Sequence, residues 1–290
     1  MQVAAALPDM QALASRLWSR DSRQHPGQLT WSLYYAEDLQ PGPAELVRVG
    51  DVVGWAWAES DDWLELCVDP AHREVAADLI AWFTDRAPAG EVATMVLETE
   101  DHLLAPLADA GFARADRPWF THHFLDLADL APVPEVDGYT FRHVEPHEAA
   151  ARAACHREAW SDFGPSRVTA SAYDGLMRAP YYRHDLDWVA LDAAGDMVAS
   201  ACLWLDPANG VVLVEPVGCA PGHRGRGLAG AVSLAALGAA WEAGAATGLV
   251  CPRGDEAYPV PGRIYRSIGF RPGPRTVTLV RPATPPRPAT

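Results

Sequence analysis

The residues best suited to chemistry lie together in one segment, 215–230. It reads Glu-Pro-Val-Gly-Cys-Ala-Pro-Gly-His-Arg-Gly-Arg-Gly-Leu-Ala-Gly. An apolar, strand-like run at 211–217 leads into this segment, and an alanine-rich helical pattern at 228–243 follows it. Glycines permit a tight turn, and the unpaired backbone N–H groups at the start of a helix attract anions. The segment therefore predicts a strand–loop–helix unit that cradles a diphosphate.

Two motifs in the second half of the chain resemble those of one known family. Motif A of the GNAT superfamily of acyl-CoA-dependent N-acetyltransferases is similar to Arg224-x-x-Gly227-x-Ala229. Motif B of that family is similar to Ile264-Tyr265-Arg266-Ser267-Ile268-Gly269-Phe270. The resemblance extends over residues 138–282, with a helix and a strand between the motifs. It implies an N-acetyltransferase that uses acetyl-CoA as co-substrate and moves the acetyl group to a primary amine by direct attack on the thioester.

The resemblance also implies which residues hold the coenzyme. The backbone at the end of the strand would hydrogen-bond the pantetheine arm and polarise the acyl carbonyl, and Gly218 would ease its close approach. The loop would bind the diphosphate, with positive charge added by two arginines. The implied coenzyme contacts are Val217, Gly218, Cys219, Arg224, Gly225, Arg226, Gly227, Leu228 and Ala229.

Two residues stand where the family carries catalytic groups. Glu215 would take a proton from the amine, often through water; alternatively it is a solvated or arginine-paired strand residue. Tyr265 would return a proton to the coenzyme A thiolate, a task that suits a pKa near 10; alternatively it is a core aromatic. Cys219 has no His–acid pair at a suitable spacing, so we expect a buried structural thiol rather than an acyl-enzyme nucleophile.

Other functions compete for the same loop. Residues 225–230 also satisfy the dinucleotide fingerprint Gly-x-Gly-x-x-Gly, but the nearest suitable acid, Glu242, falls within a helix rather than at a strand end. A Walker-type nucleotide loop is disfavoured because no lysine followed by Ser or Thr is present. A non-catalytic acyl-CoA-binding sensor stays open if Glu215 and Tyr265 do not face the thioester. A dinucleotide-binding oxidoreductase is the less favoured alternative.

The acceptor end of the site is less clearly marked. Many family members carry an asparagine before the motif B tyrosine where this chain has Tyr258, and Pro259 and Pro261 delay the start of the following helix. Aromatic residues in the second half are candidates to line an acceptor pocket, although most aromatics fill cores. These are Trp160, Tyr173, Tyr181, Tyr182 and Trp204.

The chain also contains an internal duplication. Pro70-Ala71-His72-Arg73 matches Pro221-Gly222-His223-Arg224, and Gly111-Phe112 matches Gly269-Phe270, in the same order. After Arg73 the first copy has neither glycine and gains Glu74 and Asp78, and Leu107 stands in place of a tyrosine. We therefore predict that the first copy is degenerate and does not bind coenzyme A.

These patterns predict an α+β class with a mixed sheet, made of two tandem GNAT folds. In the second copy we expect helices at 149–163 and 228–243, strands at 188–191, 198–205, 211–217, 248–251 and 276–280, and a helix that ends near Gly269. The predicted organisation is a degenerate domain at 1–128, a proline-rich linker at 129–137, a catalytic domain at 138–282 and a tail at 283–290.

Composition limits the partners. With 38 acidic and 23 basic residues the formal charge is −15, which disfavours nucleic acids and anionic membranes. The five scattered cysteines suit a reducing cytoplasm, the histidines show no metal spacing, and no apolar run could span a bilayer. We expect a cytoplasmic monomer or homodimer acting on a small-molecule or peptide amine. The sequence does not identify that amine or the preferred acyl chain.

Overall fold

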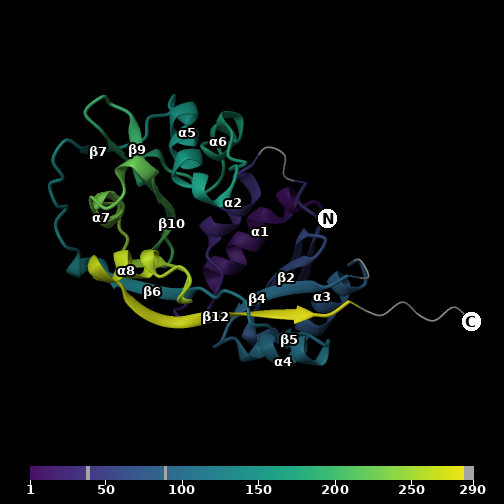
Figure 1. The fold of residues 1–290 in the computed structure, drawn as a ribbon. Coiled ribbons are helices and arrows are strands. Elements are labelled where there is room, and N and C mark those ends of the chain that lie inside the picture. Colours follow the sequence, from purple (N-terminus) through teal and green to yellow (C-terminus); the bar gives the residue numbers. More distant parts are fainter. Residues whose placement is uncertain (37–39, 88–89, 284–290) are drawn as a thin grey trace, which may run out of the picture. The chain divides into compact units, whose positions relative to one another are not determined.

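The computed structural model describes residues 1–36, 40–87 and 90–283 (Figure 1). The chain packs into two compact units. Unit 1 comprises Met1–His25, Gln40–Thr121 and Pro274–Thr290. Unit 2 comprises Pro26–Leu39 and His122–Gly273. Both are mixed α/β structures, which confirms the predicted class.

Unit 1 contains an antiparallel hairpin followed by a strand–helix–strand crossover. Its strands are ordered β1-β2-β3-β4-β12, and β5 pairs with β12; β3 and β4 are parallel. Its elements are α1 (Val3–Arg16), β1 (Ala44–Val49), β2 (Asp51–Ser60), β3 (Trp63–Val68), the 3₁₀ turn η1 (Pro70–His72), α3 (Val75–Thr84), β4 (Val92–Leu97), α4 (Asp101–Asp109), β5 (Ala113–Arg114) and the greater part of β12 (Arg271–Arg281).

Unit 2 repeats this plan with strand order β6-β11-β10-β9-β8-β7, in which β10 and β11 are parallel. Its elements are α2 (Pro26–Tyr34), β6 (Thr121–Asp126), η2 (Leu127–Asp129), β7 (Thr140–His143), α5 (Ala149–Ala159), η3 (Ser161–Phe163), α6 (Ala170–Leu176), η4 (His184–Leu186), β8 (Asp187–Leu191), β9 (Met197–Asp206), β10 (Val211–Cys219), η5 (Pro221–His223), α7 (Leu228–Glu242), β11 (Thr247–Val250) and α8 (Val260–Ser267).

Opposite faces of the unit 2 sheet carry different layers. On one face, Ala201 and Leu203 share a hydrophobic core with Val232 and Ala236 of α7. Because side chains alternate along a strand, the even-numbered residues of β9 face the other side, where α5 and α2 contact β9 and α6 packs against these two helices. Figure 1 shows α5 and α6 side by side. The small residues of α7 allow it to lie close to the sheet, as the alanine-rich pattern predicts.

The predicted duplication is visible in matching local geometry. Gly111 and Gly269 both adopt positive φ, at 87° and 103°. In each copy the following phenylalanine donates its backbone N–H to the carbonyl five residues earlier: Phe112 to Leu107 and Phe270 to Tyr265, both at 3.0 Å. This is the C-terminal cap in which a glycine reverses the chain and an apolar residue packs back on the helix.

The compact units differ from the predicted domain boundaries in three segments. Strand β6, placed in the first domain by its position in the sequence, pairs with β11 and lies in unit 2. Residues 276–281 of β12, placed in the second domain, pair with β4 in unit 1. Helix α2 also lies in unit 2, where a Cβ on Gly27 would meet Trp204 at 2.1 Å. Each segment belongs to the unit whose sheet edge or face it packs against, even where its neighbours in sequence belong to the other unit. Of the predicted tail, all but Ala283 falls outside the described residues.

Candidate active site

Strands β10 and β11 separate where the predicted site begins. They pair only between residues 211–213 and 247–249, although β10 continues to Cys219. On its other edge β10 remains paired with β9 as far as Cys219, after a bulge between Val214 and Val217. One edge of β10 past Leu213 therefore has no ladder partner among the described residues.

The backbone of this open edge presents hydrogen-bond donors. Ala220 donates its N–H to Val198 of β9 at 2.8 Å, and in an antiparallel pair the N–H groups alternate in direction. Gly218 therefore also faces β9, while Val217 and Cys219 direct their N–H and C=O groups to the open edge. The Cys219 carbonyl agrees with this, since it accepts from Arg224 Nε at 3.1 Å.

Gly218 has a packing role that the sequence did not suggest. A Cβ at this position would lie 2.2 Å from the indole ring of Trp160 and 2.7 Å from Ala159. The absent side chain makes room for the end of α5. Trp160 is held there by stacking on His156, with ring centroids 4.2 Å apart and an interplanar angle of 13°.

The loop at 224–227 forms a cradle of backbone donors. Gly225 and Gly227 have φ of 77° and 83°, a region that other residues enter only with strain. In the described chain, no oxygen accepts a hydrogen bond from the backbone N–H groups of 225–230. A Cβ on either glycine would meet nothing within 4 Å, so the space in front of the loop is open. Successive free N–H groups at a helix N-terminus fit a diphosphate.

The two arginines of the loop have different surroundings. Arg224 turns back to α5, where Nη2 donates to the Ala159 carbonyl at 3.0 Å and Nη1 pairs with Asp162. The expectation that its charge serves the diphosphate is therefore not met by this side chain, which instead anchors the loop. Arg226 is exposed and donates to the Tyr139 hydroxyl. It has no carboxylate partner within the described residues, so its charge is available to an anion.

Glu215 and Tyr265 come together at the point where the strands separate. Glu215 lies in the β10 bulge, half-buried, and its carbonyl accepts from Trp204 Nε1 at 2.5 Å. Tyr265, on α8, is 7% exposed and packs edge-on against Phe270 with ring centroids 5.8 Å apart. Burial raises the pKa of Tyr265 well above its ordinary value, and the nearby Glu215 and Cys251 raise it further. The tyrosine therefore stays protonated at neutral pH, beside an acid that it does not contact by any hydrogen bond in the described structure.

Cys219 is half-buried, not buried as the sequence suggested, and its thiol makes a structural contact. Its Sγ donates to the Ala220 carbonyl at 3.6 Å. Burial raises the pKa of this thiol, with only partial compensation by Arg224, so the thiolate needed for nucleophilic attack is disfavoured.

The positions of two prolines determine where α8 begins. The helix begins at Val260, directly after Pro259, and Pro261 lies in its first turn, where a missing N–H costs little. Tyr258, at the position of the family's asparagine, is 37% exposed just before this helix.

Two of the five aromatic residues considered for an acceptor pocket, Tyr173 and Tyr182, serve a buried ionic network instead. The hydroxyls of Tyr173 and Tyr182 donate to Asp187 at 2.5 and 2.9 Å, and Arg152 Nε donates to the same carboxylate at 2.9 Å. Trp204 is 0% exposed and meets the Tyr182 ring edge-on. Tyr181 is half-buried with φ of 67°. Of the five candidates, Trp204 contacts the Glu215 carbonyl through Nε1, and Trp160 lies against Gly218.

Sequence reasoning missed Arg152 and Asp187 altogether. A signal was present, because an arginine on the buried face of an alanine-rich helix demands a carboxylate partner. Asp187 immediately precedes an apolar strand run and was the available acid. Its role could be established only once the helix and strand were packed together.

Solved structures show the same architecture. A GCN5-related N-acetyltransferase from Sphaerobacter thermophilus superposes with a TM-score of 0.65 at 20% identity, over 97% of this chain and 94% of that chain. A tandem GNAT protein from the clavulanic acid biosynthesis pathway gives a TM-score of 0.66 at 19% identity, over 98% and 97%. An acetyltransferase of the GNAT family from Colwellia psychrerythraea gives 0.62 at 17%, over 95% and 97%.

The chain has the tandem GNAT fold. The likeness is one of structure, since no family model and no curated protein sequence matches this chain. Within this tandem GNAT fold, unit 2 holds the cradle and the open strand edge. In unit 1, only Arg73 and Glu74 separate η1 from α3, so the corresponding turn has no room for a glycine loop.

Two further findings bear on partners. In the described part of the chain, no helix has the length and apolar character needed to cross a membrane. The same residues contain no group of three or more His, Cys, Asp or Glu side chains placed to hold a metal ion.

Proposed function

We propose that unit 2 transfers an acetyl group from acetyl-CoA to a primary amine. The observation that carries this proposal is the pair of unpaired donor groups on either side of the β10–α7 turn: the backbone N–H groups of the cradle at 225–230, and the Val217 N–H on the open edge of β10. These two groups suit a ligand with a diphosphate at one end and an amide-rich arm leading to an acyl group at the other.

The surrounding residues fit the chemistry of aminolysis. The amine nitrogen would attack the thioester carbonyl carbon, and the C–S bond would break. The Val217 N–H is directed to the edge where the carbonyl oxygen gains charge, which stabilises the oxyanion. Glu215 would accept the proton lost by the amine, directly or through water. Tyr265, kept protonated by its raised pKa, would donate a proton to the departing thiolate and regain one from solvent.

A dinucleotide fits this site less well than a coenzyme A thioester. Glu242 is the last residue of α7, so the acid that a ribose would need is not at a strand end. The loop also comes after four antiparallel strands, β7 to β10, whereas a dinucleotide-binding loop follows the first strand of a parallel unit.

Binding and turnover can be tested separately. The full-length protein would be titrated with acetyl-CoA and with NADPH by isothermal titration calorimetry, and we expect binding of acetyl-CoA alone. A panel of small-molecule and peptide amines would then be assayed for acetyl-CoA-dependent thiol release, with hydrolysis as background. Binding of NADPH without acetyl-CoA would overturn the proposal. Tight acetyl-CoA binding with no amine-dependent thiol release would replace the enzyme with a non-catalytic acyl-CoA sensor.

A further inference from the structure

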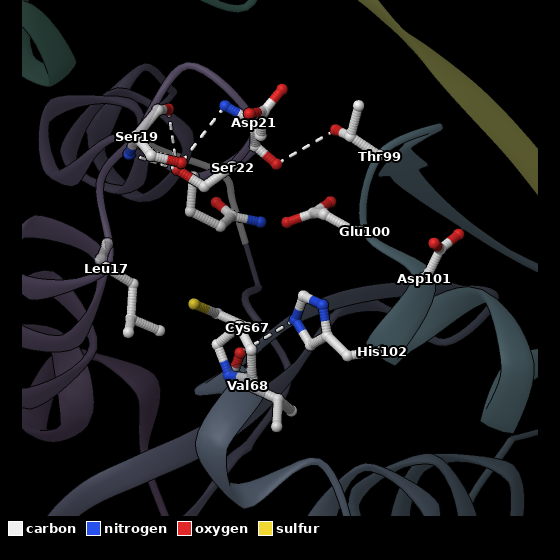
Figure 2. Close-up of a pocket in the computed structure, with 13 residues that line it drawn as sticks. Leu17, Ser19, Asp21, Ser22, Cys67, Val68, Thr99, Glu100, Asp101 and His102 are labelled. Carbon is white, nitrogen blue, oxygen red and sulfur yellow. Dashed lines mark hydrogen bonds between the residues drawn. The ribbon is translucent and has the colours of Figure 1, made fainter.

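Unit 1 contains a pocket at the position where its own central strands separate. Strands β3 and β4 pair only at Trp63 and Leu64, opposite Ala93 and Thr94, and then diverge. The pocket, of about 280 Å³, is lined by the end of β3, the residues after β4 and the segment that follows α1 (Figure 2). It therefore occupies in unit 1 the place that the open edge of β10 occupies in unit 2.

The lining of the pocket is negatively charged and partly apolar. Three carboxylates and no lysine or arginine are among its residues. The lining consists of Ala14, Leu17, Ser19, Asp21, Ser22, Gln24, Cys67, Val68, Pro70, Thr99, Glu100, Asp101 and His102. His102 adds no positive charge at neutral pH, because burial lowers its pKa, although its Nε2 lies 3.0 Å from the Val68 carbonyl.

Among the three carboxylates of the lining, Glu100 is the one that is buried without forming an ion pair in the described chain. Figure 2 shows its side chain directed into the pocket, and it is 7% exposed. Its oxygens accept backbone N–H groups from Leu97 at 2.8 Å and Arg23 at 3.2 Å, yet within the described chain it forms no ion pair. The Arg23 guanidinium is already engaged by Glu65, with Nη2 and Oε1 3.0 Å apart. Burial raises the pKa of Glu100, as expected for a carboxylate without a counter-charge.

Gln24 supplies a second, independent sign of a missing donor. It lines the pocket, is 3% exposed and uses its Nε2 on Glu65 at 3.1 Å and on the Leu66 carbonyl at 3.4 Å. These two hydrogen bonds from Nε2 fix the orientation of the Gln24 amide. Its Oε1 is left buried without a partner among the described residues. A buried acceptor of this kind costs free energy unless a ligand or water donates to it.

We propose that this pocket binds a small organic ammonium ion, with its N–H groups toward Glu100 and Gln24 and its hydrocarbon part against Leu17 and Val68. The volume suits a compact amine better than a coenzyme. Phosphate-bearing ligands are disfavoured by the three carboxylates and by the absence of a glycine cradle before α3. The site lies wholly in unit 1 and does not depend on acyl transfer by unit 2.

The test compares three probes with one hydrocarbon ring and different charge: cyclohexylammonium, cyclohexanol and cyclohexanecarboxylate. Each would be titrated into the full-length protein at neutral pH without acetyl-CoA. Glu100→Gln removes the charge, and Leu17→Trp fills the pocket from a half-buried position. Glu74→Gln makes the same charge change at an exposed site in unit 1, outside the pocket lining.

We expect cyclohexylammonium to bind at least tenfold more tightly than cyclohexanol, and the carboxylate not to bind. Glu100→Gln should weaken the cation at least tenfold and Leu17→Trp should abolish its binding, while Glu74→Gln has no effect. Thermal melts establish that each variant is folded, and if Glu100→Gln is not, Leu17→Trp decides. Thiol release by unit 2 should stay within twofold in both pocket variants, which separates this proposal from the enzymatic one.

Three outcomes would overturn the proposal. One is equal binding of all three probes, or no binding up to about 20 mM, the range of very weak ligands. Another is cation affinity that Glu100→Gln and Leu17→Trp leave unchanged. The last is a second equivalent of acetyl-CoA that cyclohexylammonium displaces, since the pocket would then be a coenzyme site.

Discussion

The two units follow one plan but differ at the turn that joins the central strand to the next helix. In both, a strand ends in a 3₁₀ turn with a Pro-x-His sequence, η1 in unit 1 and η5 in unit 2. Unit 1 then enters α3 after Arg73 and Glu74, whereas unit 2 passes through four residues, two of them glycines with positive φ, before α7. A difference of two residues thus decides whether a helix N-terminus offers its N–H groups to an anion.

A second difference lies at the helix that follows the crossover. Leu107 and Tyr265 occupy matching places, since each accepts the same backbone hydrogen bond from the phenylalanine five residues on. Leu107 is fully buried and packs in the core of unit 1, while Tyr265 adds a hydroxyl near Glu215. The helix end therefore forms with either residue, whereas the proposed proton donation requires the tyrosine hydroxyl.

The largest expected effect comes from removing the hydroxyl that distinguishes unit 2 at this position. Tyr265→Phe should lower the rate of amine-dependent thiol release about a hundredfold, at the lower end of what a positioned general acid contributes. The affinity for acetyl-CoA should not change, because the ring still packs on Phe270. Steady-state kinetics and calorimetry measure the two quantities.

The matched control for this substitution is in unit 1. Leu107→Met, a volume-conserving change at the equivalent position, should leave the rate unaltered. A Tyr265→Phe enzyme with a rate within twofold of the unchanged protein would show that the hydroxyl takes no part in the reaction.

Acid should weaken unit 2 more than unit 1 in the range from pH 7 to pH 5. Burial, with Arg152 and Arg157 nearby, lowers the pKa of His156 to about 3, from an ordinary value of 6.5. Below pH 6.5 the unfolded chain takes up a proton that the folded chain does not, so stability falls as pH falls and is unaffected above pH 7. The loss at pH 5 should be about 2 kcal/mol.

Urea unfolding at the two pH values, followed by hydrogen exchange in α5 and α3, locates the loss. His156→Phe keeps an aromatic ring against Trp160 and cannot be protonated, so its stability should change less between pH 7 and pH 5. Equal acid sensitivity of α3 and α5, or of the variant and the unchanged protein, would remove His156 as the cause.

Adding a methyl group to the cradle tests the anion site itself. Gly227→Ala should weaken acetyl-CoA about tenfold, because a Cβ strains the left-handed backbone and intrudes on the space before the N–H groups. Gly195→Ala is the matched control: its φ is 87° and its surroundings are equally open, but it lies in the β8–β9 hairpin. Both variants should lose about 1 kcal/mol of stability, and only the first should lose affinity. Equal affinity in both would place the diphosphate elsewhere.

The smallest effect concerns the arginines. Arg226→Ala should weaken acetyl-CoA about threefold, with a smaller salt dependence of binding, since an exposed guanidinium contributes little. Arg224→Ala should instead lower the melting temperature of unit 2, because it removes contacts with Ala159, Asp162 and Cys219. Titration at low and high salt together with thermal melts distinguishes the two; a reversal of these roles would contradict the observed side-chain directions.

Local sequence was sufficient wherever one turn or helix end determines the geometry. Gly225 and Gly227 signalled the cradle because few other residues accept positive φ. Gly111 and Gly269 marked equivalent helix ends for the same reason. Tyr265 was found through the resemblance of residues 264–270 to motif B of the GNAT family. Strands β8 to β11 of unit 2 also followed from their apolar runs to within two residues, whereas β6 and β7 were not predicted.

Tertiary packing decided everything that depends on partners distant in sequence. Strand β6 could pair with any exposed sheet edge, and its choice of β11 depends on which edge buries its apolar side chains. Gly218 leaves room for Trp160, and Arg224 pairs with Asp162 at the surface, because the fold brings the end of α5 to these residues. Asp187 gathers Arg152 with two tyrosines, because these polar groups are desolvated and need partners across the core. Backbone conformation is specified residue by residue, whereas the pairing of buried polar groups is specified only by the whole fold.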